Sequence, residues 1–65
     1  MKLLIHAVDD RRVMLLRDDG HVRPGRYAGR DAAGVALPEG ETVPDLDHYR
    51  RAARRGAITV AEVES

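Results

Sequence analysis

The chain has 65 residues, with 11 basic and 11 acidic side chains, three histidines and no cysteine. A chain of this length forms one small domain at most, and its folding buries only about 60% of the surface of the unfolded chain. Without cysteine, a disulfide framework and every thiolate zinc motif are excluded. No uncharged run approaches the roughly 18 apolar residues that cross a bilayer, so we expect neither a membrane span nor a secretory signal. We therefore expect a single domain over residues 1–65, with a marginal core that partners complete.

The first third of the chain carries two apolar, β-favouring runs, Lys2–Val8 and Arg12–Arg17, separated by a short polar turn. Two such runs predict an antiparallel β-hairpin, which we assign to residues 1–22. The Asp-Gly pair after the second run suits a tight turn, so a third strand is expected to start near Val22.

The second run is apolar at four successive positions, Val13, Met14, Leu15 and Leu16. Side chains alternate between the two faces of a strand, so both faces of this one would be covered. One face would pack on the domain, and Val13 and Leu15 are predicted to contribute to binding a partner. The alternative is a strand that lies in the middle of the protein's own core.

Residues 23–44 contain all three prolines and four of the six glycines, a composition typical of turns. We predict an extended, Pro/Gly-rich arm with short extended pieces at Val35–Leu37 and Thr42–Val43. Two arrangements stay open. The arm wraps its own domain, or it lies along the sheet edge of a neighbouring subunit, where Arg26 and Arg30 would pair with charges.

One amphipathic helix is predicted over residues 46–55, with an apolar face made of Leu46, Tyr49, Ala52 and Ala53. Asp45 is expected to accept the free amides of the first turn, and Gly56 to end the helix in a left-handed conformation. Asp47 and Arg51 are spaced for an exposed ion pair. Tyr49 is the largest side chain on the apolar face and must pack on something, because so short a helix is not stable alone.

After the helix, residues 57–63 carry Ile58, Thr59 and Val60 at their centre and predict a final strand. A hairpin, an arm, one helix and this strand place the chain in the α+β class.

Catalytic and metal-binding patterns are not evident in the sequence. The three histidines, His6, His21 and His48, lack the regular spacing of metal ligands. We expect them to be partly exposed side chains that bind no metal. The chain has no phosphate-binding glycine loop and no nucleophile and base pair of the usual types. We expect a protein that is not an enzyme and holds no cofactor or metal.

A basic stripe on the predicted helix, made of Arg50, Arg51, Arg54 and Arg55, raises the possibility of nucleic-acid binding. The net charge of zero and the acidic residues just before the helix argue against it. A helix face paired with nearby acids or with a partner protein is favoured, and a small nucleic-acid-binding regulator is the alternative function.

A series of short motifs runs through residues 24–60, somewhat over half of the chain. They are Pro24-Gly25-Arg26, Arg30-Asp31, Leu37-Pro38, Gly40, Val43-Pro44, the pair Tyr49 and Arg51, and Gly56 followed by Ile58. This pattern resembles a small family encoded in the tail-gene clusters of Mu-like bacteriophages and prophages. The first 23 residues have no counterpart in that pattern.

The resemblance implies a non-enzymatic structural or assembly protein of a phage virion, made in the bacterial cytoplasm and docked on other virion proteins of the tail, neck or head. A symmetric assembly of many copies is expected, which would complete the marginal core. The residues predicted to bind partners are Val13, Leu15, Arg26, Arg30, Tyr49 and Arg51.

Overall fold

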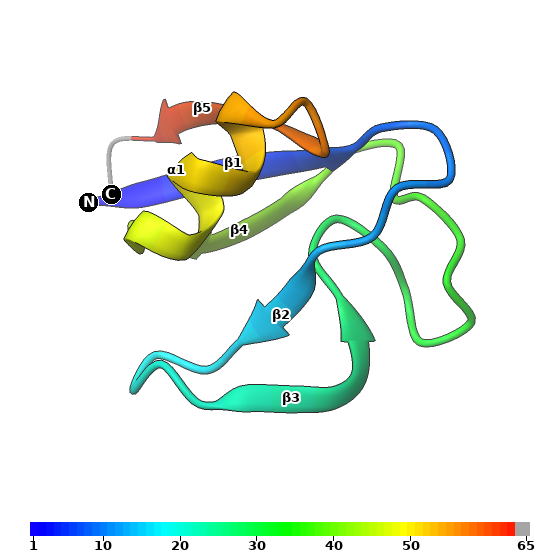
Figure 1. Ribbon diagram of the computed structural model, residues 1–65, viewed down its shortest axis with the longest axis horizontal. Coiled ribbons are helices and arrows are strands. Elements are labelled where there is room, and N and C mark those ends of the chain that lie inside the picture. The colour runs from blue at the N-terminus through cyan, green and yellow to red at the C-terminus, as the bar shows by residue number, and fades with distance from the viewer. Residues whose placement is uncertain (64–65) are drawn as a thin grey trace.

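The computed structural model describes residues 1–63, which form five strands and one helix: β1 (Lys2–Ala7), β2 (Met14–Leu16), β3 (Val22–Tyr27), β4 (Glu41–Pro44), α1 (Asp47–Arg54) and β5 (Ile58–Val63). Strand β1 is the centre of an antiparallel sheet of order β4-β1-β5, and β2 pairs with β3 in a separate two-stranded sheet (Figure 1). The predicted α+β class is confirmed, with a hairpin in the N-terminal part, one short helix and a C-terminal strand.

The hairpin consists of β2 and β3, with Met14 opposite Tyr27 and Leu16 opposite Val22. The predicted pairing of Lys2–Val8 with Arg12–Arg17 was wrong. Asp9 has a positive φ of 48°, and the turn that it begins separates β1 from β2. Strand β1 pairs instead with β4 and β5, which come from much later in the chain.

The segment predicted as an arm folds back on its own domain. Its last residues form β4, in which Val43 lies opposite Leu3 of β1. Ala36 forms an isolated bridge with Arg30, and the Leu37 amide donates to the Gly29 carbonyl at 2.9 Å. Of the two arrangements left open, the structure shows the one in which the segment wraps its own chain.

The core lies between the three-stranded sheet, the helix and the hairpin. Alternate residues of the sheet point to one face, which α1 covers (Figure 1). The buried apolar residues are Leu3, Ile5, Val13, Leu15, Ala28, Val43, Tyr49, Ala52, Ala57 and Ile58. All six elements except β3 contribute to this cluster.

Helix α1 is shorter than the predicted range 46–55, and its N-cap is Leu46, with no side-chain cap. The expectation that Asp45 caps the helix was wrong. Its carboxylate is bound by the Arg50 side chain and not by amides of the first turn. The C-terminus ends as predicted at Gly56, which has φ of 77°. The amides of Gly56 and Ala57 each donate at 3.0 Å to carbonyls of the last turn, in the Schellman arrangement.

Candidate protein-binding surface

Tyr49, predicted to bind a partner, is fully buried and joins the helix to the hairpin. Its Oη accepts a hydrogen bond from the Leu16 amide at 2.9 Å and donates to the Leu16 carbonyl at 3.3 Å. Burial raises the pKa of this phenol, because the ionised form would lose its hydration. The neighbouring His48 places Nε2 2.8 Å from the Met14 carbonyl oxygen. Two consecutive helix side chains thus form hydrogen bonds with backbone groups on the outer edge of β2.

Val13 and Leu15 are also part of the protein's own core, with exposed fractions of 3% and 4%. The open alternative, a run that serves the internal core, is the one that the structure shows for these two residues. Met14 lies on the other face of the strand and is 40% exposed. Neither Val13 nor Leu15 is therefore available at the surface to a partner.

Arg30 and Arg26 act within the chain and do not present free charges to a neighbour. The Arg30 guanidinium is buried and donates to the carbonyls of Gly34, at 3.0 Å, Arg11, at 3.0 Å, and Asp9. It thereby holds together two loops that the sheet hydrogen bonds do not connect. Arg26 is half-buried and lies 3.7 Å from Glu41, whose other carboxylate oxygen accepts the Gly29 amide.

The basic stripe of the helix is partly neutralised by acids of the same chain. Arg50 binds Asp45 at 2.7 Å and Glu62 at 3.1 Å. The hydrogen bonds that Asp45 accepts from Arg50 hold the pKa of Asp45 below its usual value. Arg51 pairs with Asp47 as predicted. Arg51 is thus the one residue of the predicted partner set that is exposed at the surface.

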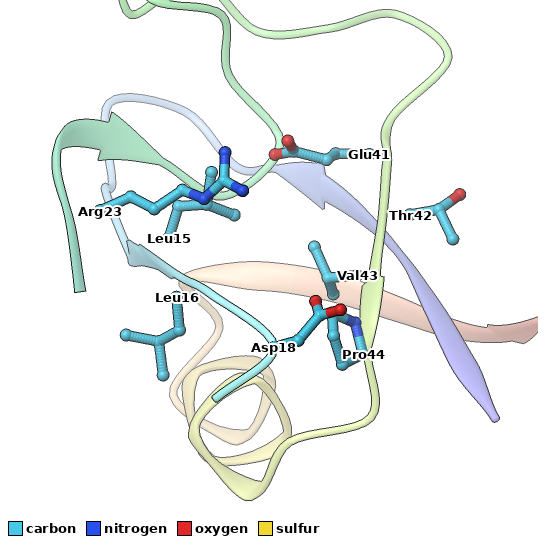
Figure 2. A pocket seen from close by; sticks show the side chains of 8 residues that line it. All are labelled: Leu15, Leu16, Asp18, Arg23, Glu41, Thr42, Val43 and Pro44. Carbon is cyan, nitrogen blue, oxygen red and sulfur yellow. The ribbon is translucent and has the colours of Figure 1, made fainter. Parts of the chain in front are cut away.

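A cleft of about 120 Å³ separates the hairpin from β4 (Figure 2). It is lined by Leu15, Leu16, Asp18, Arg23, Glu41, Thr42, Val43 and Pro44. Pockets for small organic ligands are usually about 300–1,000 Å³. The cleft is therefore better explained as the seam where the two sheets meet. Figure 2 shows the Thr42 side chain pointing away from it.

The sheet face opposite the helix forms a surface that we call the open face. Strand alternation and the cross-strand register place on it Lys2, Leu4, His6, Thr42, Pro44, Thr59, Ala61 and Val63. Four of these residues are exposed, one on β1, one on β4 and two on β5: Lys2, Thr42, Thr59 and Ala61. Of the residues of this face, only Lys2 carries a formal charge at neutral pH, whereas 34% of the whole chain is charged.

A surface of this kind suits contact with another protein. Small and apolar side chains on a flat sheet are desolvated at little cost, and charged residues are depleted at the centres of protein interfaces. The His6 imidazole lies against Gly40, leaving no room for a Cβ there. No local sequence pattern predicts this face, because its residues come from three distant segments and only the register brings them together.

Within residues 1–63, no group of three or more His, Asp or Glu side chains is arranged to hold a metal ion. The helix in this part of the chain lacks the length and apolar character needed to cross a membrane. Comparison of the sequence and structure with family models, curated proteins and solved structures finds no match. The resemblance to the phage tail-cluster family therefore stays a prediction.

Proposed function

We propose that this chain is a non-enzymatic structural or assembly protein of a bacteriophage virion, which docks on other virion proteins of the tail, neck or head through the open face. The observation that carries the proposal is that only one of the eight residues on this face, Lys2, is charged, in a chain that is 34% charged. The resemblance over residues 24–60 supplies the class of partner.

Arg26 and Arg30 bind groups of their own chain, so docking on another protein would have to use other residues. These arginines stabilise the fold that presents the open face, and they are not themselves the contacts. Arg51 belongs to α1, which covers the other face of the sheet (Figure 1), and it offers a second, charged contact to a neighbour. Such an exposed pair contributes orientation more than affinity.

Purified particles provide the test. In a phage that carries this gene, the gene would be inactivated and a plasmid copy supplied as the wild type, Thr42→Arg or Ala32→Arg. Each variant adds one arginine at an exposed position. Thr42 lies on the open face, whereas Ala32 lies in a turn outside the strands that form it. Quantitative mass spectrometry of gradient-purified heads, tails and whole particles would measure incorporation.

We expect the wild-type chain and Ala32→Arg to co-sediment with a particle or an assembly intermediate, and Thr42→Arg to be depleted at least about tenfold. Depletion is expected because a buried, unpaired charge is costly at an interface. Circular dichroism of the purified variants would establish that both are folded. Absence of the wild-type chain from particles and from intermediates would contradict the proposal.

Nucleic-acid regulation is the second candidate, favoured by the exposure of Arg51, Arg54 and Arg55. The pairing of Arg50 and Arg51 with acids reduces the positive charge available to phosphates. Fluorescence anisotropy with duplex DNA across a salt series separates the two functions. Salt-dependent binding that Arg54→Ala weakens would support the regulator, and we expect no such binding at physiological salt.

A further inference from the structure

The strand edges of this domain differ in how they are protected. Backbone groups on the outer edge of β2 are bound by Tyr49 and His48. Strand β3 contains Pro24 and Gly25, and β4 ends at Pro44 and borders the cleft. Proline, charged side chains, bulges and covering segments are the usual means by which proteins prevent pairing at an edge.

Strand β5 has only one of these protections, the charged side chain of Glu62, whose carboxylate is bound by Arg50 of the same chain. It is six residues long, with the sequence ITVAEV, and contains no proline, glycine or lysine. Within the part of the chain that the structure describes, its inner edge pairs with β1 and no strand pairs with its outer edge. β-Branched residues occupy four of its six positions, and they are the residues that favour strand pairing.

A second copy of β5 fits this edge. In an antiparallel pair related by a two-fold axis perpendicular to the sheet, residues opposite each other lie on the same face. With Val60 on the axis, Thr59 lies opposite Ala61 of the second copy, and Ile58 opposite Glu62. No two like charges are opposed, because Glu62 is the one charged residue of the strand and lies opposite the apolar Ile58.

The charge of the whole molecule favours the same partner. The net charge is zero at neutral pH, with 11 basic and 11 acidic residues, so two copies do not repel each other at long range. A closed two-fold contact also uses the edge completely, so that no open edge of β5 remains for further growth.

We infer that the outer edge of β5 pairs antiparallel with β5 of a second copy, centred on Val60, to form a continuous six-stranded sheet. The two helices then lie on one side of this sheet, and the two open faces join into one larger face on the other side. The inference does not depend on the virion proposal, because it concerns the purified chain alone.

Two double variants at the same exposed positions test the register. Thr59→Lys with Ala61→Lys places like charges opposite each other twice, whereas Thr59→Lys with Ala61→Glu places opposite charges there. Sedimentation velocity between about 10 µM and 1 mM covers the range of weak complexes. We expect the wild type and the Lys/Glu variant to dimerise, and the Lys/Lys variant to bind itself about tenfold more weakly or not at all.

Thr42→Lys is the control for stacking through the open face. Thr42 shares that face with Thr59 and Ala61 but lies on β4, at the opposite edge of the sheet. Thr42→Lys should dimerise like the wild type, with β5 amides that exchange hydrogen more slowly at high concentration. A wild type that stays monomeric to 1 mM, equal dimerisation of the two double variants, or loss of the dimer in Thr42→Lys would each overturn the inference.

Discussion

The hydroxyl of Tyr49 forms hydrogen bonds to the backbone of a single residue, Leu16, as the backbone of a paired strand would. It takes the place of a neighbouring strand for one residue of β2, accepting from and donating to Leu16. Because the ring is fully buried, the side chain also fills the space between helix and hairpin. These two contributions can be separated by substitution.

Tyr49→Phe is expected to lower the free energy of unfolding by about 1–2 kcal/mol, since it removes two hydrogen bonds and retains the ring. Tyr49→Ala should lower it by about 3–5 kcal/mol, because a cavity is added. Urea denaturation at pH 7 measures both. Equal stability of all three proteins would show that the tyrosine does not join the helix to the core.

Because the pKa of Tyr49 is raised in the folded state, the contribution of its hydroxyl to stability depends on pH in the alkaline range. The unfolded chain ionises this phenol near pH 10, whereas the folded chain keeps it protonated to higher pH, so the favourable contribution is present below pH 10 and lost above it. The stability advantage of the wild type over Tyr49→Phe should therefore narrow above pH 10. Tyr27, present in both proteins, cancels in the comparison.

Gly29 and Gly25 form a matched pair for measuring the effect of close packing. Their φ angles are 75° and 76°, but a Cβ at Gly29 would lie 2.8 Å from the Ala7 backbone nitrogen, whereas a Cβ at Gly25 would meet nothing within 4 Å. Gly25→Ala should cost about 1 kcal/mol for the strained backbone. Gly29→Ala should cost roughly 1–3 kcal/mol more, because the loop must move away from β1. Similar urea midpoints for the two variants would show that the approach to β1 relaxes without cost.

At the scale of the element, helix α1 is held at its two ends by different means. The helix ends at Gly56 through backbone hydrogen bonds. The Arg11 guanidinium also donates to the carbonyl oxygens of Arg55 and Gly56, at 3.2 Å each. At the other end, the ion pair of Asp45 with Arg50 connects the loop before the helix to its first turn. Glu62 extends this pair to β5.

Asp45→Asn should destabilise the protein at pH 7 and have little effect at acid pH. The pKa of Asp45 is lowered in the folded state, so its contribution is present above the unfolded value near 4 and is lost as the pH falls through the folded value. Urea midpoints at pH 7 and pH 3 measure the difference. Asp47→Asn, at the exposed pair with Arg51, is the control and should change the midpoint less. A constant difference between wild type and Asp45→Asn at both pH values would contradict this account.

Local patterns predicted the elements better than their pairing. Apolar runs predicted β1, β2 and β5, and Gly56 predicted the end of the helix, because these signals come from adjacent residues. The partners of β1 could not be read from such signals, since register depends on packing across the whole chain. The open face depends on that register, and the burial of Arg30 depends on three carbonyls brought together from separate loops.

At the scale of the whole molecule, the small core and the free edge of β5 predict a concentration-dependent stability. A dimer that forms only from folded chains raises the melting temperature as the protein concentration rises. We expect a midpoint below about 70 °C that increases between dilute and concentrated samples, measured by scanning calorimetry. A higher midpoint that does not vary with concentration would indicate a domain that needs no partner.

The central position of β1 has a consequence for how the protein is made. A ribosome completes β1 long before β5, yet these strands lie side by side, with Lys2 opposite Val63 (Figure 1). The hairpin of β2 and β3 can form while synthesis continues, but the three-stranded sheet cannot close until β5 has emerged. Until then β1 has no partner on that side, and its apolar residues are available to chaperones and to neighbouring nascent chains.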